Sequence, residues 1–541
     1  MHILIGGAWP YANGPLHIGH IAALLPGDVL ARYHRAKGND VYYVSGSDCH
    51  GTPVAIRAKK ENRSPAEISD YYHHEFVSVF KRLGFCYDLY GKTSSAVHQD
   101  FVKAFHQTMY ASTYIEERTA PQAYCETCGM TLTDRFVLGQ CPACGASARG
   151  DQCDACGMVL EPDSLIHPRC ETCGAAPVFH ESSQLYLAVT KLWKDLNGFL
   201  ESHPHWRKNA IAFTKRYLDE GLQDRAITRT LDWGIDVPYP GYEDKKIYIW
   251  AENVLGYLSM SYQAALQRNA DFEAIWDRNG DARHYYVHGK DNIPFHTIIL
   301  PSLLLANGGN WRLPDDIISS EYMTLEGRKI STSGNWAIWA KDVIERYDPD
   351  SLRYYCIANG PEKRDADFSW REYFHSHNSE LLGGYGNFVN RSLVFISKYL
   401  DQEVPSGTLE LAVEQAIEQA FETTGELLEA GACKAALENV FQLVRFGNQY
   451  FDSCQPWKTR ETHASLCRQS LYNCVQIAAN LSILLAPFLP FSSAKVMGWL
   501  GLSPVWRPQY VTAGYALPPV QPLFARLDQS VIEQELARLQ S

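Results

Sequence analysis

The sequence predicts an α/β protein in which a cysteine-rich segment interrupts a parallel sheet and a helical bundle follows. Three observations lead to this prediction. Near the N-terminus, short β-branched runs alternate with helical stretches. Eight of the fifteen cysteines then lie within 49 residues. Beyond residue 374, strand signals give way to long amphipathic segments.

The N-terminal part follows the order strand, glycine-rich turn, helix, strand. We expect strands over 2–8 and 40–48 with a helix between them, and a second helix over 64–83. After the cysteine-rich segment, KKIYIWAENVLGY (245–257) and ARHYYVHGKD (282–291) again have the composition of strands. The parallel sheet should therefore resume there, with helices between and after these two runs.

The chain beyond residue 374 should form the helical bundle. Apolar residues recur at helical spacing over 409–429, 435–452 and 467–485. The last stretch, 529–540, has the composition of a short charged helix. Because these segments carry no strand signal, we expect a separate helical unit.

Length and charge narrow the class of protein. A chain of 541 residues is too long for one hydrophobic core, so three or four structural units are expected. A net charge of −12 argues against a protein that coats nucleic acid, although it does not exclude a specific RNA partner. The N-terminus lacks the basic region of a secretory signal, and polar residues and two prolines break the most apolar tract, 477–491. We therefore expect no membrane span.

The cysteines indicate metal rather than disulfides. Eight of them form four Cys-x-x-Cys pairs, each followed by glycine, and the other seven are dispersed singly, as free thiols in a reducing compartment are. Redox proteins rarely carry four such pairs, whereas four thiolates make one closed tetrahedral zinc site. The sequence therefore predicts a cytosolic protein with two structural zinc ions. The predicted ligands are Cys125, Cys128, Cys141, Cys144, Cys153, Cys156, Cys170 and Cys173.

The run PLHIGH, residues 15–20, lies between a predicted strand and a predicted helix. His17 and His20 flank Gly19, whose missing side chain lets a ring or a phosphate approach the backbone. The helix N-terminus and two imidazole N–H groups would face anionic oxygens. Alone, His-x-Gly-His is a weak signal, because a run this short often arises by chance. Its place after a glycine-rich turn favours a nucleotide site.

The run GRKISTS, residues 327–333, combines two adjacent cations with three hydroxyl groups. Arg328, Lys329 and the hydroxyls suit the triphosphate of a nucleotide. The competing interpretation is a solvated surface loop, which the composition alone favours.

In these two runs the sequence resembles class I aminoacyl-tRNA synthetases, whose signatures are HIGH and KMSKS. The surrounding PYANGPLHIGH is similar to the form found in methionyl-tRNA synthetases, and the resemblance extends from His2 to Lys458. Two positions of the second signature depart from the family: Ile330 replaces a methionine, and Thr332 stands where a second lysine is usual. The loss of one cation implies that Lys329, with help from Arg328, carries more of the transition-state charge.

The resemblance implies a fold and its division. A Rossmann-type catalytic sheet would be split by a zinc-bearing insertion and followed by an α-helical anticodon-binding domain. The resemblance also implies nested zinc sites, in which the middle two cysteine pairs share one ion and the outer two share the other. Sequential pairing is the alternative that the spacing leaves open. The expected segments are 1–115 and 226–325 for the catalytic domain, 116–225 for the insertion, 326–373 for the KMSKS-type loop and stem-contact region, and 374–541 for the anticodon-binding domain.

The resemblance assigns roles in a pocket for ATP and methionine. For the aromatic residues the alternative is core packing, and for the aspartates it is a loop or helix-cap carboxylate. Trp9, where leucine is usual, and Glu252–Asn253, where Asp-Ala is usual, depart from the family and would reshape the pocket wall. The implied catalytic residues are His17, His20 and Lys329; the ATP site adds Gly19, Asp291 and Thr332; and the methionine site comprises Tyr11, Asp48, Trp250, Tyr257 and His296.

The run NQYFDSCQPWKT resembles the anticodon-binding motif of the same family. The resemblance implies that Asn448, Pro456 and Trp457 contact the anticodon, with Trp457 stacked on a base. A tryptophan buried where a proline starts a helix is the alternative. Val394 and Lys398 match poorly, because asparagine and arginine are common at those positions in the family.

The resemblance thus implies that L-methionine is activated by ATP with Mg²⁺ and transferred to the 3′ end of tRNA(Met), by a cytoplasmic monomer with two zinc ions. Two rivals share some of these features. Another class I synthetase would share both signatures, but the leucine, valine and isoleucine enzymes carry a long editing insertion, and the zinc of the cysteine enzyme would have only Cys49 near the first signature. A zinc-ribbon RNA-binding protein would explain the cysteines and leave PLHIGH and GRKISTS without a role.

Overall fold

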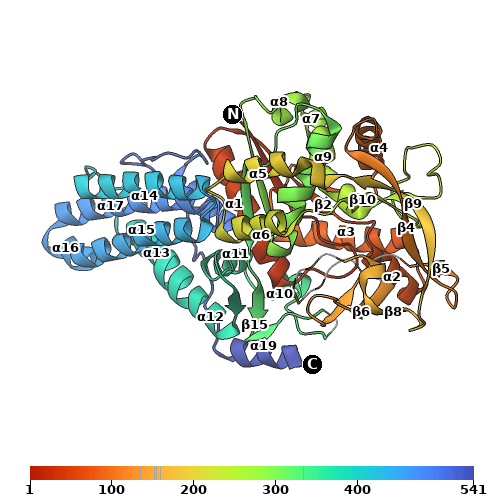
Figure 1. The fold of residues 1–541 in the computed structure, drawn as a ribbon. Coiled ribbons are helices and arrows are strands. Elements are labelled where there is room, and N and C mark those ends of the chain that lie inside the picture. Colours follow the sequence, from red (N-terminus) through yellow and green to blue (C-terminus); the bar gives the residue numbers. More distant parts are fainter. Residues whose placement is uncertain are drawn as a thin grey trace.

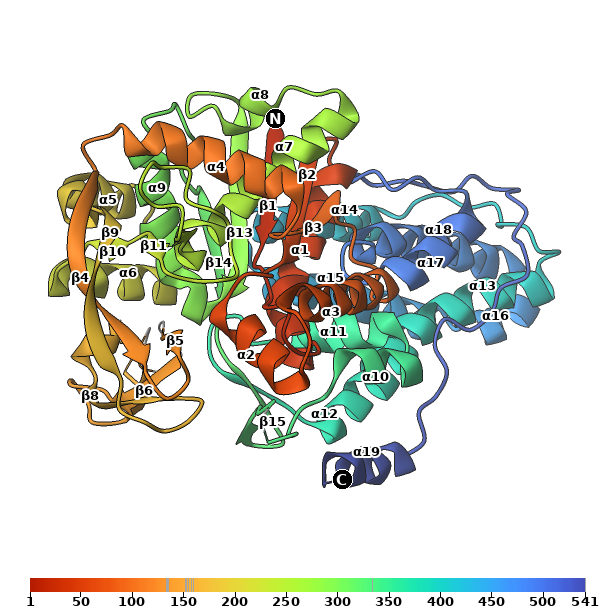
Figure 2. The same ribbon diagram turned by 90° about the vertical axis from the view of Figure 1, so that its right-hand side faces the viewer.

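The computed structural model describes residues 1–540 except 133–135, 151–152, 154, 157, 159 and 333. Its centre is a five-stranded sheet (Figure 1), and the strands, labelled in Figure 2, have the order β14-β13-β1-β2-β3, in which every neighbouring pair is parallel. The strands predicted over 2–8, 40–48 and 282–291 are confirmed. The sheet consists of β1 (His2–Gly7), β2 (Asp40–Ser47), β3 (Leu89–Lys92), β13 (Ala282–Gly289) and β14 (Asp316–Ser320).

The central strand β1 has helices on both of its faces. Ile3 and Ile5 pack in the core that holds α1 (Ile18–Ala36), whereas Leu4 packs in the core that holds α7 (Gly256–Arg268). Both faces are covered, which is why the strand is apolar along its length. β2 lies on one side of β1 and β13 on the other, so the direction of winding reverses at β1. A ligand crevice forms at such a reversal, outside the carboxyl ends of the strands.

One predicted strand is wrong. Of KKIYIWAENVLGY, only β12 (Lys246–Ile247) forms a strand, and it pairs with β11 (Thr228–Arg229) outside the main sheet. The chain then continues as 3₁₀ turns at Ile249–Ala251 and Asn253–Leu255. A short apolar run has the same composition whether it pairs in a sheet or lines a pocket. Here it lines the pocket described below.

The insertion is a long antiparallel ribbon with the cysteine pairs at its tip. β4 (Ile115–Cys125) pairs along its length with β9 (Val178–Leu187). Near the tip, β6 (Val137–Gln140), β7 (Ser147–Arg149) and β8 (Ile166–Cys170) form a separate three-stranded sheet. Its core is small and contains several of the cysteine side chains. A core of this size gives little hydrophobic stabilisation, so the tip depends on cross-links of another kind.

The helical half of the molecule, which the chain forms beyond residue 374, lies on the opposite side of the sheet from the insertion (Figure 2). Among the described residues, no helix is both long and apolar enough to cross a bilayer. The three helices predicted for the bundle are confirmed as α14 (Leu411–Glu429), α15 (Cys433–Cys454) and α17 (Ala464–Leu485), and they are joined by α13 (Asn387–Tyr399), α16 (Pro456–Thr462) and α18 (Pro490–Leu500).

The predicted charged helix is confirmed as α19 (Ser530–Gln540), which returns to the segment that carries GRKISTS. Glu535 is buried and accepts hydrogen bonds from Arg346, at 2.8 and 2.9 Å, and from the Tyr347 hydroxyl at 2.9 Å. The same helix packs on α12 (Trp370–His375). α19 therefore fastens the helical half to the loop-bearing segment.

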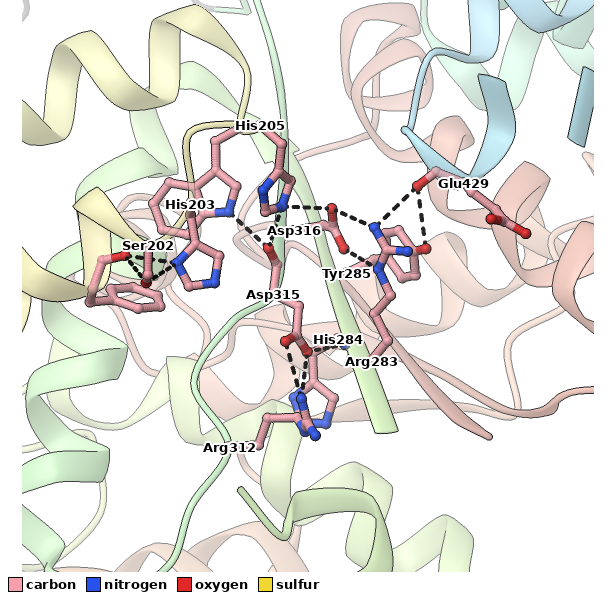
Figure 3. A network of polar contacts seen from close by, with 12 residues as sticks. Ser202, His203, His205, Arg283, His284, Tyr285, Arg312, Asp315, Asp316 and Glu429 are labelled. Atoms are coloured by element: carbon pink, nitrogen blue, oxygen red, sulfur yellow. Dashed lines mark hydrogen bonds and ion pairs between the residues drawn. The ribbon is translucent and has the colours of Figure 1, made fainter. Parts of the chain in front are cut away.

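A polar network joins the sheet to the helical half at the amino ends of β13 and β14 (Figure 3). Arg283 donates to both oxygens of Asp316, at 2.7 and 3.1 Å, and to the Glu429 carbonyl at 3.4 Å. Asp315 accepts from Arg312 at 3.1 Å. Because β13 and β14 start here and end at the crevice, this network fixes the helical half at the end of the sheet away from the crevice.

Candidate active site and metal centres

The PLHIGH run begins α1 and caps it with two imidazoles. His17 is the N-cap residue, and its Nδ1 accepts the Gly19 N–H at 3.1 Å. Nδ1 of His20 accepts the His17 N–H at 3.1 Å, which completes a capping box. The two rings stack with their centroids 3.8 Å apart. The sequence predicted the helix N-terminus but not that the two histidines cap it.

These hydrogen bonds determine which ring nitrogen carries the proton. Because Nδ1 of each ring accepts an N–H, the proton of the neutral imidazole lies on Nε2. Burial and the neighbouring His20 lower the pKa of His17 well below its usual value, and burial lowers the pKa of His20 to about 4. Both rings are therefore neutral at physiological pH, and each has one Nε2–H donor for a ligand.

The segment after GRKISTS pairs with the PLHIGH run. The Ile18 N–H donates to the Ile338 carbonyl at 2.9 Å, and the Ala340 N–H donates to the Leu16 carbonyl at 2.8 Å. These backbone bonds join two signatures that lie more than 300 residues apart in the chain. They fix the base of the GRKISTS loop against the start of α1.

Within the loop, Ile330 reaches the PLHIGH run. Its Cδ1 lies 3.4 Å from where a Cβ on Gly19 would stand. Arg328 and Lys329 are both exposed, and the guanidinium of Arg328 lies 4.0 Å from the centre of the Trp336 ring. A phosphate can therefore approach either cation of this loop from solvent.

Two other predicted ATP contacts are exposed. Asp291, two residues after β13, accepts a hydrogen bond from the Tyr322 hydroxyl. Thr332 is exposed on the GRKISTS loop, and Ser333, the last residue of that run, lies outside the described residues. Contact between these residues and a nucleotide stays a prediction.

Asp48 follows β2 and stands beside Tyr11. The Asp48 N–H donates to the Pro10 carbonyl at 2.9 Å, and the Ala12 N–H donates to the Asp48 carbonyl at 2.8 Å. The carboxylate is buried, and its Oδ2 accepts from Asn253 Nδ2 at 3.0 Å. Its Oδ1 has no hydrogen-bond partner among the described residues. One buried carboxylate oxygen therefore remains for a ligand.

Tyr257 and His296, both predicted methionine contacts, pack together in an aromatic wall. The Tyr257 hydroxyl donates to His296 Nε2, and His296 Nδ1 donates to the Asn292 carbonyl, both at 2.8 Å. Burial lowers the pKa of His296 to about 4, so the ring is neutral and both nitrogens are satisfied. Trp250 lies edge-on to Phe295, with centroids 4.8 Å apart. The ring surfaces left to a ligand are apolar, which suits a thioether.

Trp9 fills the space between two glycines near this wall. A Cβ on Gly46 would lie 2.2 Å from the Trp9 ring, and a Cβ on Gly256 would lie 2.3 Å from it. The Trp9 ring is edge-on to the Tyr257 ring, with the two ring centroids 6.3 Å apart. The sequence identified Trp9 as a departure but did not link it to the glycines. The available signal was a glycine within a predicted strand, where glycine is disfavoured unless another group approaches the backbone.

A buried pair near Asp48 was not predicted. His50 Nδ1 lies 2.6 Å from Glu252 Oε1, and both side chains are buried. His98 Nε2 lies 3.6 Å from the same oxygen. Because His50 and Glu252 are 202 residues apart, no local pattern links them.

The eight paired cysteines form two clusters, and the nested grouping is confirmed. In each cluster the four Sγ atoms lie within 4.8 Å of one another, with individual separations from 3.4 to 3.9 Å. A tetrahedron with Zn–S bonds of about 2.3 Å requires Sγ separations of about 3.8 Å, so both clusters fit zinc. The outer cluster is Cys125, Cys128, Cys170 and Cys173, and the inner cluster is Cys141, Cys144, Cys153 and Cys156.

The glycines after the cysteine pairs allow the chain to turn around each cluster. Gly129, Gly145 and Gly174 have φ angles of 62°, 70° and 77°, which glycine adopts at little cost. Gly157, after the third pair, lies outside the described residues.

Trp457 is the second residue of α16 and lies on the surface of the helical half. Its side chain is 41% exposed, stacks on Phe451 at 5.9 Å and lies 5.8 Å from the Arg391 guanidinium. The alternative of a buried tryptophan is therefore wrong. Pro456 is buried, and the Asn448 amide donates to two backbone carbonyls, at 3.0 and 3.2 Å. Among the three predicted anticodon residues, Trp457 has the exposed surface that a base requires.

Comparison with known proteins agrees with this geometry. Residues 3–393 match the family described as tRNA synthetases class I (M), and residues 402–529 match the anticodon binding domain of methionyl tRNA ligase. Methionine--tRNA ligase 1 of Alkaliphilus oremlandii is 52% identical over 542 residues, which cover 100% of both chains. A methionine--tRNA ligase of Bacillus cereus is 51% identical over 543 residues, which cover 100% of this chain and 99% of the relative.

A solved structure shares the fold. Mycobacterium tuberculosis methionyl-tRNA synthetase in complex with methionyl-adenylate superimposes with a TM-score of 0.80 at 23% identity, over 97% of this chain and 100% of the other. The Rossmann-type sheet, the inserted cysteine clusters and the helical domain predicted from the sequence are thus confirmed. The chain belongs to the methionine--tRNA ligase family of class I tRNA synthetases.

Proposed function

We propose that this chain activates L-methionine with ATP and transfers the methionyl group to the 3′ end of tRNA(Met). The observation that carries this proposal is the buried Asp48 carboxylate, which has one oxygen without a donor among the described residues. A buried carboxylate requires a cationic partner such as an ammonium group. The apolar rings of Tyr257 and Trp250 suit a thioether. The two features together fit the two ends of methionine.

In the first step, a carboxylate oxygen of methionine attacks the α-phosphorus of ATP, and the bond from that phosphorus to the bridging oxygen breaks to release pyrophosphate. The substrate supplies the nucleophile, so the protein contributes position and charge. The neutral His17 and His20 donate Nε2–H to the phosphate oxygens as their charge grows, and Lys329 adds a cation. Gly19, Asp291 and Thr332 complete the ATP site, and Mg²⁺ accompanies the triphosphate.

In the second step, a hydroxyl of the terminal ribose attacks the carbonyl carbon of the adenylate. The carbon–oxygen bond to AMP breaks, AMP leaves, and the hydroxyl proton is released. Trp457 stacks on a base of the anticodon at the far end of the helical half, with Pro456 and Asn448 supporting it. The cytoplasmic location, the monomeric state and the segment boundaries stay predictions from the sequence.

Pyrophosphate exchange into ATP should depend on methionine and be nearly absent with leucine. An apolar pocket distinguishes one methylene by about 1–3 kcal/mol, so close isosteres of methionine will be activated to some degree. The measurement is exchange with each amino acid in turn. Strong exchange with leucine or cysteine, or none with methionine, contradicts the proposal, and no exchange at all favours the RNA-binding rival.

Two zinc ions should be bound per chain. The reason is the fit of both Cys₄ clusters to tetrahedral Zn–S geometry. Metal analysis should give two zinc per chain for the native protein and one for Cys141→Ser, because that change removes a ligand from the inner cluster only. Cys356→Ser, which changes a buried cysteine outside both clusters, is the matched control and should keep two. One zinc or fewer in the native protein contradicts the proposal.

A further inference from the structure

Three acceptor oxygens close to the aromatic wall lack hydrogen-bond donors. Asp48 Oδ1, Glu252 Oε2 and Asn253 Oδ1 are inaccessible to solvent and have no partner among the described residues. Two of them belong to carboxylates that are buried almost completely. Unpaired buried acceptors are costly, so their concentration at one place indicates a ligand that donates hydrogen bonds.

The charges at this place leave Asp48 as the carboxylate that a cation would pair with. Burial alone would lower the pKa of His50, but the Glu252 carboxylate raises it. Burial alone would raise the pKa of Glu252, but His50 lowers it. These two groups therefore form a buried ion pair at 2.6 Å. Burial, and to a smaller extent Glu252, raise the pKa of Asp48 to about 7, which a bound cation would reverse.

Asn253 determines how the Asp48 carboxylate is turned. Its Nδ2 donates to Oδ2 at 3.0 Å, and this bond leaves Oδ1 as the oxygen without a donor. The amide is uncharged, so it holds the carboxylate without competing for the cation. An alanine at this position would remove the only side-chain donor that the described residues give to Asp48.

We infer that Asn253 is a positioning residue for the α-ammonium group of the amino acid substrate: its amide fixes the Asp48 carboxylate so that Oδ1 receives the ammonium. This inference rests on the proposed function. Asn253 acts through Asp48 and not on the reacting atoms, so it affects how well methionine binds and leaves adenylate formation unchanged once methionine is bound.

The first test compares Asn253→Ala with Asn253→Leu in pyrophosphate exchange. Both changes remove the donor, whereas leucine keeps a side chain of similar volume. Losing a hydrogen bond to a charged group should raise KM for methionine about tenfold or more in both variants, with little change in kcat or in KM for ATP. Asn197→Ala, which removes an exposed amide from Glu201 at 2.8 Å, is the matched control and should keep the native KM. A native KM in the leucine variant, with a raised KM in the alanine variant, assigns Asn253 to packing and overturns the inference.

The second test asks whether the loss concerns the ammonium group. Methioninol carries that group and 4-(methylthio)butan-1-ol, which is otherwise identical, lacks it, and both are measured as competitive inhibitors of exchange. The native enzyme should prefer methioninol, and this preference should fall about tenfold in both variants. If the variants keep the native preference for methioninol, the role of Asn253 is overturned and the ammonium site at Asp48 is not affected. No preference in the native enzyme removes the ammonium site at Asp48 and, with it, the observation on which the proposed function depends.

Discussion

Replacing His20 with alanine should slow methionine-dependent pyrophosphate exchange about 100- to 1,000-fold while KM for methionine changes little. The neutral ring presents Nε2–H to phosphate oxygens whose charge grows in the transition state, and removing one such donor typically costs about 2.7–4 kcal/mol. The measurement is kcat and KM of exchange, together with a thermal melt.

A pair of variants separates this donor from the helix cap. In His20→Asn, the side-chain oxygen reaches the position of Nδ1, so it can accept the His17 N–H but leaves no donor at the position of Nε2. In His20→Gln, the longer amide reaches the position of Nε2 and supplies a donor there. If the donor matters, the asparagine variant should be as slow as the alanine variant and the glutamine variant faster. The reverse order would make His20 a capping residue.

Trp457→Ala should reduce aminoacylation at limiting tRNA about tenfold to a hundredfold and leave pyrophosphate exchange unchanged. Stacking on one base contributes about 1–3 kcal/mol, and the loss should appear mainly in KM for tRNA. Because the ring is exposed and lies in the helical half, its truncation should leave the melting temperature and the adenylate site unaffected.

Trp457→Phe is the conservative control for this experiment. It keeps a ring for stacking on a base and for the contact with Phe451, so most of the charging activity should return. A sharp fall in melting temperature, or exchange that declines together with charging, would show that Trp457 supports the fold and does not contact the anticodon.

The regular parts of the fold could be predicted because their signals are local. The strand–turn–helix–strand order at the N-terminus follows from β-branched runs separated by glycine and histidine, and the bundle helices follow from apolar spacing. The strand predicted over KKIYIWAENVLGY is wrong because the composition of this run suits a strand and a pocket wall equally. The nested cysteine grouping came from the family resemblance, since spacing alone left sequential pairing open.

The site could be predicted only in part, because much of it depends on contacts between distant residues. His17 and His20 were identified, but their capping bonds, which fix the protonated nitrogen, appear only in three dimensions. Glu252 and Asn253 were noted as departures, yet nothing in their sequence neighbourhood points to His50 or Asp48. The charge balance inside a protein depends on such pairs of distant residues, and a local sequence pattern does not show which residues will pair.

The position of Trp9 has a consequence for the order in which substitutions can be accepted. Its ring occupies the volume that any side chain at Gly256 would need, whereas at Gly46 the ring and the Gly91 carbonyl oxygen both exclude a side chain. While Trp9 is present, Gly256 cannot change, and once Gly256 has gained a side chain the tryptophan cannot return. A smaller residue at position 9 must therefore come first in any lineage that replaces Gly256, while the backbone of β3 keeps Gly46 constrained whatever residue stands at position 9. Trp9 and Gly256 form one epistatic pair, so their residues should be exchanged together when this pocket is engineered or compared between relatives.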